Sequence, residues 1–205
     1  MTSPSVVLGS GSPRRRELLV SRLVEPRVVS PDVDETPKSD ETPIEYVRRL
    51  AAAKLDVVLG RVGQSAVGTI VIAADTTVDV DGRIVGKPVD GDDARRILAR
   101  LSGRTHFVHT GLAVAVAVPG CRGSDWEGHV EVDTAAVTFR PLDTDEIDAY
   151  VASGEPLDKA GAYGIQGPAR DFVERVEGLV STVVGLPIER LDEIVAGLGG
   201  RWPGA

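Results

Sequence analysis

A short apolar run, SVVLG (residues 5–9), leads through a glycine–serine turn into a helix that is expected to begin at Pro13 and to end near Leu23. A strand, a tight turn and a helix start form the basic phosphate-binding unit of α/β proteins. Ser12 is a good N-cap, and proline is well tolerated as the first helical residue. This unit therefore predicts an α/β fold with an anion site close to the N-terminus.

Three consecutive arginines, Arg14 to Arg16, occupy the first turn of this helix. A helix start carries a partial positive charge, so cations are disfavoured there and anions are favoured. One interpretation is that a bound polyanion, usually phosphate, stabilises the cluster. The other is that the long side chains extend into solvent, and this stretch alone does not decide between them.

The rest of the chain alternates between helical and strand patterns. TIVIAAD (69–75) is typical of a buried strand that ends at Asp75, and Asp81-Gly82 marks a two-residue hairpin. The segments 105–118 and 129–139 alternate as antiparallel strands do, so the sheet is expected to be mixed. No repeat or linker divides the chain, which predicts a single domain over 1–205 with a loose tail at 199–205. Helices are expected at 43–62, 90–103, 143–152 and 186–200, and a further strand at 172–178.

Composition restricts the partners. The net charge of −8 argues against a broad surface for nucleic acid, so the arginines suggest a local site for a small anionic ligand. A single cysteine, Cys121, allows neither an intramolecular disulfide nor a cysteine zinc cluster. No apolar run reaches the ~18 residues of a membrane span. We therefore expect a soluble, cytoplasmic protein without a membrane partner.

Several common sites are absent. The chain has no G-x-x-x-x-G-K-[ST] phosphate loop, and GSGSPR (9–14) has arginine where a dinucleotide-binding motif has its last glycine. No G-x-S-x-G motif occurs, and Cys121 has no recognisable base, which disfavours covalent hydrolase chemistry. His106 and His109 are three apart in a strand and face opposite ways, which argues against a metal pair.

Carboxylates and lysines are the remaining candidates. Asp75 at a strand end and Glu35 in an acidic loop with Asp32 and Asp34 come from separate segments, as suits a hard cation such as Mg²⁺ beside phosphates. The alternatives are that Asp75 caps the next turn and that the acidic loop is merely solvated. Lys54 lies in an apolar helical stripe, which favours a side chain extending to solvent over a ligand contact.

Four blocks, taken together, resemble the Maf family of nucleoside triphosphate pyrophosphatases, also named septum formation inhibitors. They are LGSGSPRRRELL (8–19), DVDET (32–36), AADTTVDVDGRIVGKP (73–88) and GEPLDKAGAYGIQG (154–167), and they follow the family's order. The resemblance implies a two-lobed mixed sheet flanked by helices, similar to inosine triphosphate pyrophosphatases, with the active site in the cleft. It also implies a homodimer and a divalent cation, Mg²⁺ or Mn²⁺.

The resemblance implies hydrolysis of a nucleoside triphosphate to the monophosphate and pyrophosphate, with Asp75 as the base that activates water. Arg14, Thr76 and Gln166 match the positions that distinguish the family's dTTP- and UTP-hydrolysing branch. Glu35, Lys54 and Lys87 match recurrent active-site positions. We expect Glu35 and Asp75 to share the metal, and the substrate phosphates to contact Ser10, Ser12, Arg15, Lys54 and Lys87.

One segment departs from the family pattern. EGLVST (177–182) stands where a serine–tyrosine pair is common, so an aromatic contact is missing. Two other functions stay open: pyrophosphatase activity on another modified or purine nucleotide, and nucleotide-dependent regulation of cell division.

Overall fold

A mixed sheet forms the centre of the protein, whose computed structural model describes residues 5–63, 66–118 and 126–203. The strand order is β2–β1–β3–β5–β6–β7, and β4 pairs with β3. β1 is parallel to β2 and β3, and the other pairs are antiparallel. The predicted mixed α/β fold is thus confirmed. The strands are β1 (Val6–Gly9), β2 (Arg27–Val28), β3 (Ile70–Val80), β4 (Arg83–Val85), β5 (Thr105–Ala117), β6 (Trp126–Phe139) and β7 (Val173–Glu177).

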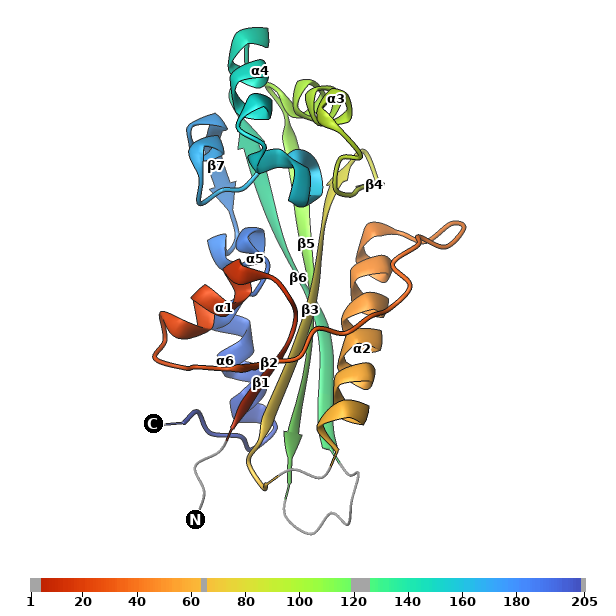
Figure 1. Cartoon of the computed structure of the whole chain (residues 1–205), viewed down its shortest axis with the longest axis vertical. Coiled ribbons are helices and arrows are strands. Elements are labelled where there is room, and N and C mark those ends of the chain that lie inside the picture. The colour runs from red at the N-terminus through yellow and green to blue at the C-terminus, as the bar shows by residue number, and fades with distance from the viewer. Residues whose placement is uncertain (1–4, 64–65, 119–125, 204–205) are drawn as a thin grey trace.

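Helices cover both faces of the sheet. Figure 1 shows α2 on one face, α1 and α6 on the other, and α3 and α4 together at the far end of the long strands. Residues 75–78 in the middle of β3 line the cavity described below. The helices are α1 (Pro13–Val20), α2 (Pro43–Val62), α3 (Gly91–Leu101), α4 (Thr144–Ala152), α5 (Val180–Val184) and α6 (Ile188–Gly197), with short 3-10 turns at Glu155–Asp158, Ala160–Ala162 and Pro168–Phe172.

Three apolar clusters hold these layers together. Under α2 the sheet presents small residues, including Ala73 and Ala113, so this long helix lies close to the strands. The opposite face packs leucine and isoleucine side chains beneath α1 and α6. At the far end, aromatic residues join the aliphatic ones, with Phe139 and Tyr163 edge to face at 4.8 Å between ring centroids.

Several predicted elements are confirmed. The Asp81-Gly82 hairpin is present with both residues at positive φ, as its tight turn requires, and β5 and β6 form the expected antiparallel pair. α2 begins after Thr42, whose side chain and that of Glu45 form a reciprocal capping box. The predicted helices at 90–103, 143–152 and 186–200 appear as α3, α4 and α6.

Two predictions need correction, and two short elements were not predicted. The first helix ends at Val20 rather than near Leu23. The strand that starts at Ile70 continues to Val80, so Asp75 lies in the middle of β3 and neither ends a strand nor caps a turn. The sequence pattern gave no indication of β2 and α5, because two and five residues are too few for a periodic signal.

The C-terminal segment folds back onto the body of the protein. Trp202 packs against the cluster beneath α6, and its indole N–H donates to Asp192 at 3.0 Å. Cys121 lies outside the described residues. Within those residues, no helix combines the length and the apolar character needed to cross a membrane.

The buried histidine of β5 predicts a loss of stability in acid. His106 is 1% exposed, its Nε2 bonds the Tyr163 hydroxyl at 2.9 Å, and its Nδ1 has no partner among the described residues. Burial lowers the pKa of His106 from 6.5 to about 4. Below pH 6.5 the unfolded chain therefore binds a proton that the folded chain does not, and the free energy of unfolding falls until about pH 4. The full loss is about 3 kcal/mol.

Urea unfolding at pH 7 and pH 5 measures this effect as the difference between wild type and His106→Leu. The wild type is expected to lose more stability than the variant over this interval. His129→Gln is the control, because His129 is at the surface. An equal loss in wild type and His106→Leu would show that His106 does not titrate as proposed.

Candidate active site

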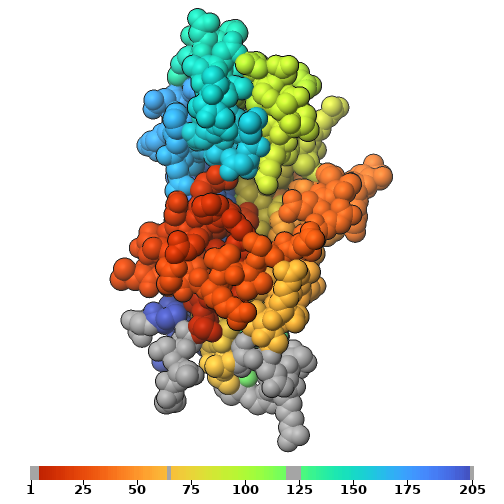
Figure 2. Space-filling view, viewed as in Figure 1, coloured from red at the N-terminus to blue at the C-terminus, as the bar shows by residue number. Residues whose placement is uncertain are grey.

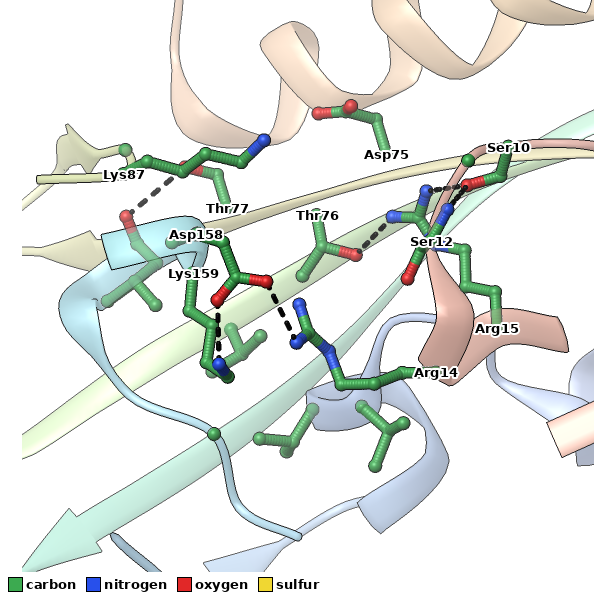
Figure 3. A pocket seen from close by; sticks show the side chains of 18 of the residues that line it. Ser10, Ser12, Arg14, Arg15, Asp75, Thr76, Thr77, Lys87, Asp158 and Lys159 are labelled. Carbon is green, nitrogen blue, oxygen red and sulfur yellow. Dashed lines mark hydrogen bonds and ion pairs between the residues drawn. The ribbon is translucent and has the colours of Figure 1, made fainter. Parts of the chain in front are cut away.

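A cavity of about 680 Å³ opens between the start of α1, the side of α2 that carries Tyr46 and Lys54, the middle of β3 and the loop from Asp158 to Gln166. In Figure 2, the N-terminal segment and residues near 155–165 meet on the surface beside this cavity. Figure 3 shows polar side chains from several of these elements converging on its interior. Its lining includes Ser10, Ser12, Arg14, Arg15, Glu35, Lys54, Asp75, Thr76, Lys87 and Gln166, which are all the site residues that the sequence predicted.

The three arginines of α1 have three different surroundings. Arg14 lines the cavity, and its Nη1 lies 3.6 Å from Asp158 Oδ2. Arg15 is buried, while Arg16 pairs with Glu25 outside the cavity lining. Neither interpretation of the cluster therefore holds for all three side chains, because only two of them face the cavity.

Arg15 is fixed by neutral acceptors. Its Nε donates to the Gly185 carbonyl at 2.7 Å and its Nη1 to the Ala74 carbonyl at 2.8 Å. Two hydroxyl groups, Ser10 Oγ and Thr76 Oγ1, accept from Nη1 and Nη2 at 3.0 Å each. None of these partners neutralises the guanidinium, so Arg15 supplies a fixed positive charge in the cavity wall.

Lys54 links two carboxylates at the centre of the cavity. Its Nζ lies 2.5 Å from Asp75 Oδ1 and 2.6 Å from Glu35 Oε1. The interpretation that Lys54 extends into solvent is therefore wrong, since 8% of the residue is exposed. A pattern along one helix could not identify these partners, because they come from a different strand and a different loop.

The two carboxylates have opposite pKa shifts. Burial raises the pKa of Asp75 above its ordinary value, and the nearby charges of Lys54 and Arg15 offset this only in part. Burial also raises the pKa of Glu35, but the hydrogen bond and charge of Lys54 outweigh it and bring that pKa below the ordinary value. A general base is most efficient when its pKa lies near the working pH. The raised pKa of Asp75 is closer to that value, which favours Asp75 for proton transfer.

The acidic residues of the loop differ in whether they line the cavity. Asp32 and Asp34 are exposed and do not line the cavity, so they fit the solvated-loop interpretation. Glu35 is half exposed as well, but it lines the cavity and contacts Lys54. The Tyr46 hydroxyl of α2 donates to the Glu35 backbone carbonyl at 2.9 Å. Burial and the charges of Asp75 and Glu35 raise the pKa of Tyr46 to about 12, so its hydroxyl remains a donor.

Known proteins resemble this chain over nearly its whole length. A profile of the Maf family, described as Maf-like protein, matches residues 5–198. The chain belongs to the Maf family. A relative from Hahella chejuensis is 48% identical over 183 residues, which are 89% of this chain and 87% of that protein. A second relative, from Sphingopyxis alaskensis, is 45% identical over 197 residues, which are 96% of this chain and 97% of that protein. Both carry the name dTTP/UTP pyrophosphatase.

A solved structure is also similar. The nucleoside-triphosphatase / dITP/XTP pyrophosphatase from Mycobacterium abscessus is 16% identical to this chain. The two superpose with a TM-score of 0.41 over 95% of this chain and 94% of that structure.

The departure from the family pattern lies behind the cavity. The Thr182 carbonyl accepts from Thr110 Oγ1 at 2.8 Å, and its hydroxyl donates to Asp133. The Thr110 hydroxyl is also hydrogen-bonded to the Thr76 hydroxyl, which accepts a hydrogen bond from Arg15. In this Maf-family chain the segment thus connects to the buried arginine through hydroxyl groups. Val183 and Val184, just after it, line the cavity.

A hard divalent cation fits the carboxylates of the cavity in chemistry. Asp75 and Glu35 offer oxygen ligands from two elements, which is the donor type that Mg²⁺ prefers. No group of three or more histidine, cysteine or acidic residues arranged to hold a metal occurs in the described part of the chain. A cation held by one or two carboxylates commonly takes its remaining ligands from substrate phosphates and water.

Sequence reasoning missed two groups of the cavity, Tyr46 and the Asp158–Lys159 pair. Tyr46 is eight residues before Lys54 and therefore on the same side of α2, a spacing that could have indicated a shared surface. Asp158 and Lys159 lie inside the glycine-rich block 154–167, where no periodic pattern indicates direction.

Proposed function

We propose that this chain hydrolyses dTTP and UTP to the monophosphate and pyrophosphate. The observation that carries the proposal is the buried Asp75 carboxylate, held by Lys54 in a cavity whose wall also contains Arg15 and the start of α1. Relatives that cover most of this chain support the nucleotide class through their name, dTTP/UTP pyrophosphatase. Thr76, Gln166 and Arg14, which match the positions of that branch, all line the same cavity.

In the proposed reaction a water oxygen attacks the α-phosphorus, and the bond from that phosphorus to the oxygen bridging to the β-phosphate breaks. Asp75 accepts the proton of the attacking water, while pyrophosphate leaves with the electron pair of the broken bond. Lys54 orients Asp75 through its short contact with Oδ1. A bound divalent cation, held by Asp75 and Glu35, would supply positive charge to the phosphate oxygens and polarise water.

The remaining cations of the cavity suit the triphosphate. Lys87 lies close enough to Glu35 to lower its pKa, so its charge reaches the region of the two carboxylates. Ser12 occupies the N-cap of α1 without a capping hydrogen bond from its side chain, and it lines the cavity with Ser10. Fixed donors and charges of this kind stabilise the charge that develops on the transferred phosphoryl oxygens.

Pyrophosphate release from dTTP, UTP, CTP, ATP, GTP, ITP and 7-methyl-GTP tests the proposal, with Mg²⁺, with Mn²⁺ and with EDTA. We expect turnover of dTTP and UTP that EDTA abolishes. Turnover of a different base would support a pyrophosphatase for another nucleotide, and turnover that survives EDTA would exclude the cation. No release from any nucleotide would leave a nucleotide-binding regulator of cell division as the better proposal.

The proposed partner is the nucleotide alone, without nucleic acid. The homodimer that the family resemblance implies and the cytoplasmic location expected from the composition stay predictions, which sedimentation and cell fractionation can check.

A further inference from the structure

Asp158 and Arg14 come from different elements of the cavity wall and form an ion pair. Asp158 is the last residue of the 3-10 turn Glu155–Asp158, and its Oδ2 lies 3.6 Å from Arg14 Nη1 at the start of α1. Lys159 Nζ holds the other carboxylate oxygen at 2.7 Å and also donates to the Glu155 carbonyl at 2.6 Å. Figure 3 shows Asp158 between Arg14 and Lys159. The carboxylate is thus anchored on one side and only loosely paired on the other.

This carboxylate is an acceptor at neutral pH. Burial raises the pKa of Asp158, but the hydrogen bond from Lys159 and the charge of Arg14 outweigh it and bring the pKa below its ordinary value. An ionised carboxylate offers acceptors and no donor. It also repels phosphate, so this part of the cavity suits the uncharged portion of a nucleotide better than its triphosphate.

Apolar side chains line the same cavity. Val183 and Val184 come from the end of α5, and Ile165 precedes Gln166 in the loop after Asp158. The hydrogen bond from Arg15 to the Gly185 carbonyl places the end of α5 beside the start of α1. Arg14, beside Arg15, and Val184, beside Gly185, therefore come from adjacent segments. Apolar walls with a few polar groups are typical of sites for planar heterocycles.

The polar groups of this region match one base edge. Uracil and thymine present a carbonyl oxygen on each side of an N3–H group, which requires an acceptor between two donors. Arg14 supplies donors, Asp158 supplies the acceptor, and the Gln166 amide can donate. Cytosine instead presents an unprotonated N3, which an ionised carboxylate cannot bond.

We propose that Asp158 determines base specificity by accepting the N3–H of uracil or thymine, while Arg14 and Gln166 donate to the flanking carbonyl oxygens. The proposal rests on the proposed pyrophosphatase function and extends it to a residue outside the phosphate-binding groups. The loose contact of Asp158 with Arg14 leaves both side chains able to bond the base without a large rearrangement. Cytosine is then rejected because its N3 would face the carboxylate without a proton between them.

Asp158→Asn changes this acceptor into a group that can also donate, at nearly unchanged size. In a mixture of UTP and CTP, the ratio of CMP to UMP formed is expected to rise at least about tenfold relative to wild type, because a hydrogen bond to a charged group is lost for UTP and one is gained for CTP. The ratio does not depend on how much of the variant is folded. Asp145→Asn is the matched control, since Asp145 is exposed on α4 and does not line the cavity.

A chemical variant tests the same bond from the substrate side. UTP methylated at N3 has no proton for Asp158, so wild type is expected to hydrolyse it at least about tenfold less efficiently than UTP. Asp158→Asn should lose less on this methylation than wild type does. If the variant turns over too slowly, calorimetric binding of UMP and CMP gives the same comparison without catalysis.

The outcomes separate the two proposals. If wild type releases no pyrophosphate from UTP or dTTP, the proposed function fails. If wild type is active but Asp158→Asn leaves the ratio of CMP to UMP within twofold, Asp158 does not read the base. Equal losses for both nucleotides would mean that Asp158 only supports Lys159 and the loop, and would overturn the specificity proposal.

Discussion

Asp75→Asn is expected to reduce pyrophosphate release from dTTP and UTP by a factor of about 10² to 10⁴, the range that a general base contributes. The substitution keeps the size of the side chain and removes its ability to accept a proton. Asp75 is 8% exposed on β3, so its carboxylate has a fixed position beside Lys54 that a free water does not reproduce. The loss is expected mainly in kcat, because the triphosphate still meets Lys87, Arg15 and the start of α1.

The pH profile distinguishes a lost base from a damaged site. Burial raises the pKa of Asp75, and a base acts only when deprotonated. Wild-type activity should therefore fall as the pH falls through a value above the ordinary range of aspartate. Asp75→Asn should lack this acid limb in its residual activity. Single-turnover rates from pH 4.5 to pH 8 measure both profiles.

Asp56→Asn is a suitable control for these rates. Asp56 is exposed on α2, two residues from Lys54, and lies outside the cavity lining. It should retain wild-type activity and the acid limb. If Asp75→Asn kept more than half of the wild-type rate, Asp75 would not be the base, and Glu35 would be the next residue to test.

The sequence predicted the elements of this fold better than the contacts between them. Periodicity identified α2 and the β5–β6 pair because each is long enough to repeat its pattern. It also suggested an anion site at the start of α1. It could not predict that Arg15 would be bound by the carbonyl groups of Ala74 and Gly185, because those residues are distant in sequence.

Lys54 shows the same limit within the site. A lysine in an apolar stripe indicates only that the side chain leaves the helix among buried residues. Its direction depends on Asp75, which the strand brings beneath α2, and on the loop that carries Glu35. The family blocks did group these residues, because a motif in a fixed order reflects contacts that one segment alone does not reveal.

Gly111→Ala is expected to separate α2 from the sheet at the candidate site. Gly111 pairs with Asp75 in the register of β3 and β5, so the two residues lie side by side on the α2 face. A methyl group on Gly111 would overlap the Val47 carbonyl oxygen and lie 2.6 Å from the Val47 carbonyl carbon. These are backbone atoms of α2, so no side-chain rotation relieves the clash and the helix itself must shift.

The shift has two expected consequences. Overpacking of this kind costs about 1–3 kcal/mol of unfolding free energy. It also moves Lys54 relative to Asp75, because Lys54 lies two turns beyond Val47 on α2. Displacement of a catalytic group by about 1 Å can cost about 100-fold in rate. We therefore expect Gly111→Ala to lower kcat about 100-fold at a temperature where the variant is still folded.

Gly60→Ala is the control, because it replaces a glycine by alanine without steric overlap. Gly60 is in α2 as well, and a methyl group there meets no atom within 4 Å. Alanine is the better helix former, so this variant should be more stable by about 0.5–1 kcal/mol and fully active. Thermal unfolding and pyrophosphate release measure both variants. If Gly111→Ala were destabilised but catalysed at the wild-type rate, the contact of α2 with β5 would support the fold without positioning Lys54.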